Sequence, residues 1–322
     1  METNARIRWL SVITNLGVFI ALSTSAFAQG SERYDGPIID MHMHVYPVSE
    51  GPGQRPCAPR PCAGPARVAK TDEEVFRLTL EMMDEHNVVL GFLSHADSKT
   101  IDDLFEWVDA APDRFIASPN ICDPDDADLK RIEREYEAGR LAGMGEVSSQ
   151  YCGLAIDDPK LADVFALADK YDVPVLVHSH GTGAMTEQFR IDIGRPTRIE
   201  EVLLRHPNLR VYIEDAGFPF LEDTIALMYR YPNVYGDLSN ISWIYPRKTF
   251  YKYFESLIDA GFGKRLMFGT DQMQWPEVIP LVVKAIEMAP FLTIEQKRDV
   301  FYNNAARFLQ LTEEEIAAHH GR

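Results

Sequence analysis

Residues 37–44 read PIIDMHMH, a short apolar run that ends in two histidines two positions apart. Such a run is typical of a buried β-strand. Successive side chains of a strand point to opposite faces, so His42 and His44 project to the same side, with Asp40 behind them. Two imidazoles at the end of one buried strand supply half of a divalent metal site. The alternative, two ordinary polar residues at a strand end, has to be judged against the rest of the chain.

Residues 1–28 have the form of a secretory signal peptide. Arg6 and Arg8 precede an apolar stretch at 9–22, and Ala-Phe-Ala at 26–28 has the small-x-small form of a cleavage site. An uncleaved membrane anchor is the weaker alternative, because polar residues interrupt the stretch and no other segment has the ~20 apolar residues of a membrane span. We therefore expect a protein secreted to a bacterial periplasm, without membrane association once processed.

The rest of the chain has the length of one large domain. We expect a linker over 29–36, the domain over 37–312 and a frayed tail over 313–322. The formal net charge of −17 argues against nucleic acid as a partner, because phosphate binding needs clustered Lys and Arg. The expected ligand is therefore a small molecule.

Export also permits disulfides. Cys57 and Cys62 flank the short segment Ala-Pro-Arg-Pro, and this pair is the preferred bridge. Cys122 and Cys152 follow two different predicted strands, and form either a second bridge or two buried thiols. A cysteine-only zinc site is disfavoured, because the CxxC pairs that it needs are missing from the sequence.

A repeated strand-then-helix rhythm predicts a parallel sheet. The expected strands are 37–44, 88–94, 114–119, 141–148, 173–178, 209–214, 233–238 and 265–270. The expected helices start with one at the capping box of residues 71–74, continue over 101–110, 125–138, 159–171, 197–205, 219–230, 247–260 and 276–289, and end with one capped at Thr293. Eight such units predict an α/β fold, a single-domain (β/α)₈ TIM barrel. An open doubly wound sheet is the alternative, but no Gly-rich phosphate-binding fingerprint follows the first strand.

Catalytic residues of such barrels lie at the C-terminal ends of the strands. Beyond the first strand, these ends carry His95, Glu146, His178 and His180, Glu214 and Asp215, and Asp271. Each of these polar groups would be costly to bury unpaired. As ligands of a divalent ion they would satisfy one another.

The segments DMHMH at 40–44, GE at 145–146, PVLVH at 174–178 and FGTD at 268–271 together resemble the amidohydrolase superfamily. The resemblance is to the amidohydrolase-related branch, which includes aminocarboxymuconate-semialdehyde decarboxylase, resorcylate decarboxylases and several lactonases, and it spans the whole mature chain. It implies a TIM barrel with one or two divalent ions. Zn²⁺ is the first choice, with Mn²⁺ or Mg²⁺ as alternatives. Because dimers are common among these relatives, it also implies a homodimer.

The resemblance further implies a role for each matching position. His42, His44 and Asp271 would hold the more buried ion, and His178 would be a further ligand. Asp271 would also take a proton from metal-bound water and pass it to the leaving group. Glu146 stands where some members place a carboxylate that two metals share.

One position departs from the family pattern. Members usually carry a histidine at the end of the sixth strand, followed by a glycine, and here Asp215 stands at the histidine position. Asp215 could be an oxygen ligand, which favours Mn²⁺ or Mg²⁺. It could act instead as a general base, or it could mark the loss of the second metal position. His180, two residues after His178, could compensate.

The predicted reaction is hydrolysis of an amide, ester or lactone. A divalent ion lowers the pKa of bound water to about 7 and polarises a carbonyl oxygen. Non-oxidative decarboxylation of an aromatic or enol acid is the alternative that the relatives imply. A binding barrel without catalysis is the second alternative, supported by Asp215. A nuclease is disfavoured by the acidic charge.

Candidate substrate contacts lie around the predicted barrel mouth. The loop over 45–70 is basic within an acidic chain, and its Arg55 could pair with a substrate carboxylate. The alternative is a solvated loop. Trp243 could form an apolar wall for a ring or pack the top of the barrel, and Arg247 is a second candidate anion partner. The predicted substrate contacts are therefore Arg55, His95, His180, Trp243 and Arg247.

Overall fold

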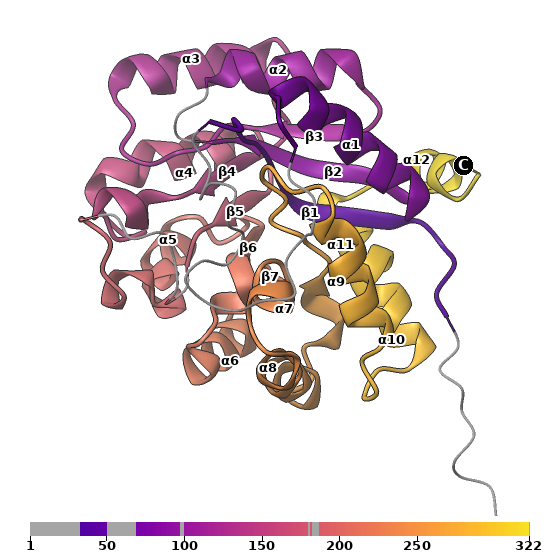
Figure 1. The fold of residues 1–322 in the computed structure, drawn as a ribbon. Coiled ribbons are helices and arrows are strands. Elements are labelled where there is room, and N and C mark those ends of the chain that lie inside the picture. Colours follow the sequence, from indigo (N-terminus) through magenta and orange to yellow (C-terminus); the bar gives the residue numbers. More distant parts are fainter. Residues whose placement is uncertain (1–32, 50–68, 97–99, 180, 182–186, 322) are drawn as a thin grey trace, which may run out of the picture.

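The computed structural model describes residues 33–49, 69–96, 100–179, 181 and 187–321 (Figure 1). The predicted signal peptide, the predicted Cys57–Cys62 bridge, Arg55 and His180 lie outside these residues. Among the described residues, no helix is both long and apolar enough to cross a membrane.

Within the described residues, eight parallel strands follow one another along the chain. They lie around the centre of the molecule (Figure 1). They are β1 (Ile38–Val45), β2 (Val88–His95), β3 (Phe115–Ser118), β4 (Met144–Val147), β5 (Val175–Val177), β6 (Val211–Ile213), β7 (Val234–Asp237) and β8 (Leu266–Met267). Strands β1 to β3 form one sheet and β4 to β8 a second, and within each sheet every strand pairs with the next along the chain.

Backbone hydrogen bonds join the two sheets at both seams. Between β8 and β1, Met41 N donates to Phe268 O (2.9 Å) and Asp271 N donates to His42 O (2.8 Å). Between β3 and β4, Ile121 N donates to Glu146 O (2.8 Å). The (β/α)₈ barrel predicted from the sequence is therefore confirmed, and its strand ends converge on one site.

The predicted helices are present and surround the strands (Figure 1). They are α1 (Asp72–Glu85), α2 (Ile101–Ala110), α3 (Asp126–Glu137), α4 (Ala162–Lys170), α5 (Glu200–Arg205), α6 (Leu221–Arg230), α7 (Ile241–Ile244), α8 (Arg247–Asp259), α9 (Val278–Glu287), α10 (Ile294–Arg298), α11 (Asn304–Leu309) and α12 (Glu313–His320). Local capping explains where several begin: the Thr71 side chain accepts a hydrogen bond from Glu74 N at the start of α1 (3.1 Å).

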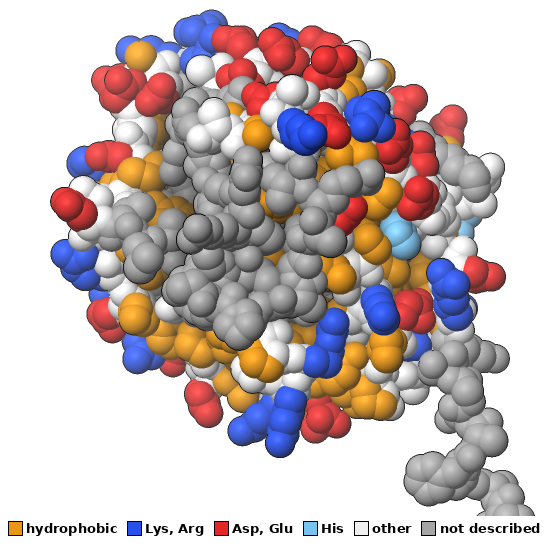
Figure 2. Space-filling model, viewed as in Figure 1, with side chains coloured by type: hydrophobic (Ala, Val, Ile, Leu, Met, Phe, Trp, Pro, Cys, Tyr) orange, Lys and Arg blue, Asp and Glu red, His pale blue; other side chains and the backbone are white. Residues whose placement is uncertain are grey.

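On the face drawn in Figure 2, the described Lys and Arg side chains are interspersed with Asp and Glu. On this face, the described charged side chains therefore form no patch of a single sign.

An apolar cluster fills the inside of the barrel, next to the strand ends that carry the polar residues. Ile39, Leu176 and Met267 from three strands pack there with Tyr212 of β6 and Phe308 of α11. The Tyr212 hydroxyl donates to the backbone oxygen of Met41 (2.6 Å), so the chain just before His42 is tied to β6.

The C-terminal tail predicted to fray is instead the helix α12. Thr312 caps it and forms a reciprocal capping box with Glu315. His319 is buried, and its Nδ1 lies 2.9 Å from the hydroxyl of Tyr302. The capping box was visible in the sequence, but the burial of His319 depends on a tertiary contact.

Cys122 and Cys152 form a disulfide across 30 residues. The bridge was one of the two alternatives for this pair. It joins the segment after β3 to a short 3₁₀ turn, η1 (Ser149–Cys152), that follows β4.

Gly145 precedes Glu146 and has a backbone conformation in which a side chain would clash. This conformation directs the Glu146 side chain into the barrel. Its φ is +102°, and an added Cβ would lie 2.3 Å from the backbone oxygen of Leu176. Only glycine combines this conformation with so close an approach.

We expect Gly145→Ala to lower the free energy of unfolding by about 3 kcal/mol or more, because a clash adds to backbone strain. Urea unfolding of the mature protein measures the loss. Gly139→Ala is the control, since Gly139 also has a positive φ (+70°) but no atom within 4 Å of its added Cβ. The control should cost about 1 kcal/mol, and equal losses in both variants would contradict the close approach.

Candidate metal centre

The two histidines of β1 converge as the sequence predicts. His42 and His44 are buried, and their Nε2 atoms lie 3.1 Å apart. Asp40 stands behind them and accepts hydrogen bonds from Thr270 N (3.0 Å) and Thr270 Oγ1 (2.6 Å). Burial raises the pKa of Asp40 to about 7. Asp40 therefore fastens the segment that leads to Asp271 onto β1.

The second nitrogen of each imidazole has its own partner. His42 Nδ1 lies 3.1 Å from Asp237 Oδ2 and 3.3 Å from Ser239 Oγ. His44 Nδ1 lies 2.9 Å from Ser94 Oγ. Such partners fix the ring orientation of metal-ligating histidines, and here both Nε2 atoms are turned toward the same point.

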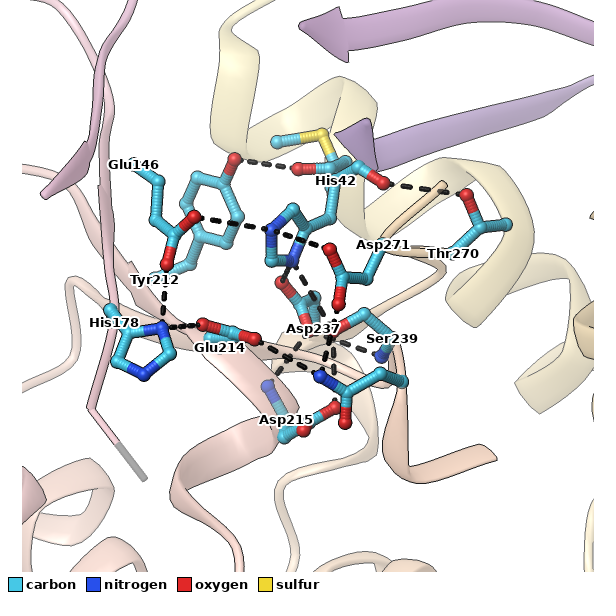
Figure 3. Close-up of polar contacts among 12 residues, drawn as sticks. His42, Glu146, His178, Tyr212, Glu214, Asp215, Asp237, Ser239, Thr270 and Asp271 are labelled. Atoms are coloured by element: carbon cyan, nitrogen blue, oxygen red, sulfur yellow. Dashed lines mark hydrogen bonds and ion pairs between the residues drawn. The ribbon is translucent and has the colours of Figure 1, made fainter. Parts of the chain in front are cut away.

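Two carboxylates, those of Glu146 and Asp271, face the His42 imidazole (Figure 3), and both also lie close to His44. Asp271 Oδ1 lies 3.3 Å from His44 Nε2 and 3.7 Å from His42 Nε2. Glu146 Oε2 lies 3.4 Å from His44 Nε2. We call these four residues, His42, His44, Glu146 and Asp271, the first cluster.

Glu146 also belongs to a second cluster, with His178 and Glu214. Its other oxygen, Oε1, lies 2.6 Å from His178 Nδ1, and Glu214 Oε2 contacts the same nitrogen. The potential ligand atoms of Glu146, His178 and Glu214 lie within 4.8 Å of one another, as do those of His42, His44 and Glu146. One carboxylate thus links two groups of donors (Figure 3).

The end of β6 differs from the sequence expectation. Glu214, not Asp215, joins the second cluster. The Asp215 side chain accepts hydrogen bonds from Ser239 Oγ (3.1 Å) and Ile241 N (2.9 Å). Burial, together with the carboxylates of Glu214 and Asp237, raises the pKa of Asp215 well above its usual value.

Strand alternation explains why Glu214 is the inward residue. Tyr212 of β6 points into the barrel, and the residue two positions later points the same way. The chain then turns into a left-handed conformation at Asp215 and Ala216, with φ values of 50° and 47°, which takes the Asp215 side chain elsewhere. The alternation was readable from the sequence, but the turn was not.

Asn240 is a site residue that sequence reasoning missed. Its Nδ2 donates to Asp271 Oδ2 (3.0 Å) and to Glu214 Oε1 (3.3 Å). One amide therefore holds a carboxylate of each cluster. An asparagine among the polar residues after β7 carries no sequence signal that would single it out.

Three of the predicted substrate contacts, His95, Trp243 and Arg247, lie within the described chain. His95 is half-buried, with Nδ1 2.9 Å from Ala96 O and Nε2 accepting from Asn120 N (3.2 Å). Trp243 is buried and donates from Nε1 to Thr270 O (2.9 Å), so it packs behind the segment that carries Asp271. The Arg247 guanidinium lies 5.5 Å from the centre of the Tyr251 ring on α8.

The donor set fits a divalent metal ion. Imidazole nitrogens with carboxylate oxygens are ligands that Zn²⁺ and Mn²⁺ accept. Burial opposes a charge on His178, yet the Glu214 and Glu146 carboxylates raise its pKa to about 10. At His42, burial is likewise outweighed by Asp237 and Asp271, and its pKa lies well above the usual value. Negative charge therefore dominates both clusters, and a divalent cation would compensate it.

Comparison with known proteins agrees with this architecture. The model of the family described as Amidohydrolase matches residues 39–311. No curated protein sequence matches the chain.

Three solved structures illustrate the fold. An uncharacterised TIM-barrel protein from Bordetella bronchiseptica is 19% identical with a TM-score of 0.65, covering 89% of this chain and 100% of that one. A dihydroxybenzoic acid decarboxylase from Polaromonas, with bound manganese and the inhibitor 2-nitroresorcinol, is 14% identical with a TM-score of 0.62, covering 87% and 99%. A probable 2-pyrone-4,6-dicarboxylic acid hydrolase from Acinetobacter baumannii, with citric acid bound, is 14% identical with a TM-score of 0.59, covering 85% and 99%.

We expect the mature protein to bind about two equivalents of Zn²⁺ or Mn²⁺, one for each cluster. Metal analysis by mass spectrometry after loading and desalting measures the number. His42→Ala/His44→Ala should lose at least one equivalent. His206→Ala is the control, because His206 pairs with Asp169 away from both clusters. Metal-free wild-type protein after loading would contradict the assignment.

Ser94→Ala should weaken metal binding by about ten- to a hundredfold, because His44 loses the partner that orients its ring. Competition with a chromophoric chelator measures the dissociation constant. Ser256→Ala on the outer helix α8 should leave it unchanged. An unaltered dissociation constant in Ser94→Ala would show that Ser94 does not orient a ligand.

Proposed function

The chain belongs to the amidohydrolase family, and from this premise we propose that it is a metal-dependent hydrolase of small molecules with an amide, ester or lactone carbonyl. The observation that carries the proposal is that the two carboxylate oxygens of Glu146 face different groups. Oε2 lies near the histidine pair of β1, and Oε1 lies near His178. A carboxylate shared by two donor groups suits a site for two ions, the arrangement that best supports attack by water on a carbonyl.

The two clusters would hold the ions as follows. His42, His44, Asp271 and Glu146 would bind one, and Glu146, His178 and Glu214 the other. Bound divalent ions would supply Lewis-acid polarisation of the carbonyl and activation of water.

Asp271 is the residue that we propose as proton carrier. Its Oδ1 faces the histidine pair, while Oδ2 is held by Asn240. It would accept the proton of the attacking water and deliver it to the leaving oxygen or nitrogen. Asp215 is not proposed as base, because its side chain is bonded to Ser239 and Ile241.

We also propose that the protein is exported, with a bacterial periplasm as its place of action. Besides the form of residues 1–28, the Cys122–Cys152 disulfide supports this proposal, because disulfides persist in oxidising compartments. A carboxylate on the substrate and a homodimeric assembly stay predictions.

Decarboxylation is the second candidate, because the manganese-bound decarboxylase from Polaromonas shares the fold. The experiment is to incubate the metal-loaded mature protein with panels of esters, lactones, amides and hydroxybenzoic acids, and to identify the products. A carboxylic acid released with an alcohol or amine, or a single hydroxy acid from a lactone, supports the proposal. Release of CO₂ from the aromatic acids would replace it with decarboxylation. Metal-dependent ligand binding without turnover would leave a binding barrel.

For the best substrate, we expect Asp271→Asn to lower kcat by about 10²- to 10⁴-fold, the usual contribution of a positioned acid–base group. Initial rates at saturating substrate and metal measure the loss. Asp259→Asn, an exposed change at the end of α8, is the control. A kcat within about threefold of wild type in Asp271→Asn would exclude Asp271 as proton carrier.

A further inference from the structure

The disulfide lies at the seam between β3 and β4, one of the two seams of the barrel, next to Glu146. Strands β3 and β4 share no ladder, and an isolated bridge between Ile121 and Val147 joins them. Ile121 N donates to Glu146 O (2.8 Å) and Ser148 N donates to Ile121 O (2.7 Å). Cys122 is the next residue after Ile121. The covalent link therefore reinforces the point where the two sheets meet beside the shared carboxylate.

The second cysteine of the disulfide, Cys152, lies in the same turn as Tyr151. Cys152 is the last residue of η1, and Tyr151 directly precedes it. The Tyr151 ring lies on the His178 imidazole, with ring centres 4.4 Å apart and planes inclined by 47°. This is the contact distance of packed aromatic rings.

The segment after β5 extends the same aromatic contact. Phe189 lies 5.5 Å from the centre of the Tyr151 ring and 6.4 Å from that of His178. Gln150, also in η1, donates from Nε2 to Arg190 O (3.0 Å). A displacement of η1 would thus reach both aromatic rings that lie beside His178.

We infer that the Cys122–Cys152 disulfide is a positioning element of the site: it fixes η1, so that Tyr151 and Phe189 hold the His178 ring with Nδ1 toward Glu146 and Glu214. Hydrogen bonds with Asp237, which accepts from His42, and with Ser94 orient the rings of the first cluster. In the second cluster, aromatic packing held by a disulfide contributes to the same task. The inference rests on the proposed function only in giving His178 a role in that chemistry.

The test observes the His178 ring directly. We would record the ¹H–¹³C ε1 signals of the histidines by NMR in the mature protein without substrate, with the His178 signal assigned through His178→Gln. Tyr151→Leu should move this signal, because the ring current of the tyrosine is lost. Tyr151→Phe keeps the aromatic ring and should keep the signal near its wild-type position.

The decisive variant is Cys122→Ser/Cys152→Ser. We expect its His178 signal to move in the same direction as in Tyr151→Leu, while the signal of His206, which bonds Asp169 outside the site, stays in place. A wild-type His178 signal in this variant would overturn the inference and leave the disulfide a role in stability alone.

If the double variant fails to fold, the wild-type protein is reduced with a phosphine and the same signals are recorded. Loss of the fold by both routes would also overturn the inference, because the bridge would then be needed by the whole barrel. The readout needs no turnover. Absence of hydrolysis would therefore contradict the proposed function without affecting this result.

Discussion

Glu146 is buried between imidazoles on both of its sides, with one carboxylate oxygen toward the histidines of β1 and the other toward His178. A carboxylate can be held in such a place only if opposite charge or good donors surround it. The surrounding backbone brings Glu146 and these imidazoles together. Gly145 lets the backbone approach Leu176 closely enough to aim the side chain inward. Parallel strands bring β1, β5 and β6 to the same end of the barrel.

The buried carboxylates of the site raise the pKa values of His42 and His178. Asp237 and Asp271 act on His42, and Glu214 and Glu146 act on His178, strongly enough to outweigh the burial of both rings. The Asn240 side-chain amide donates one hydrogen bond to Asp271 and one to Glu214, and so fixes the two clusters relative to each other. The barrel presents this arrangement at its strand ends, and the same fold is found in structures described as a decarboxylase and as a probable hydrolase.

Much of this could be predicted from the sequence, because short apolar strands and capped amphipathic helices have local signals. The positions of His42, His44, Glu146, His178 and Asp271 followed from strand ends. Strand alternation from Tyr212 favours Glu214 as the inward residue, but the family pattern pointed to Asp215, and the left-handed turn that takes the Asp215 side chain away has no sequence signal. Asn240 and the contact between Tyr151 and His178 join residues from different strand–helix units, and no local pattern encodes them. Trp243 was ambiguous, because the same burial could serve a substrate wall or packing.

The helix α12 has a practical consequence for handling the protein. It packs through Ile316 against the inner cluster that contains Ile39 and Leu176, below the strand ends that carry the two clusters. The helix α12 therefore lies at the end of the barrel away from the strand ends that carry the two clusters. A tag, a fusion partner or a surface linkage attached after α12 would therefore be anchored away from the residues of the two clusters.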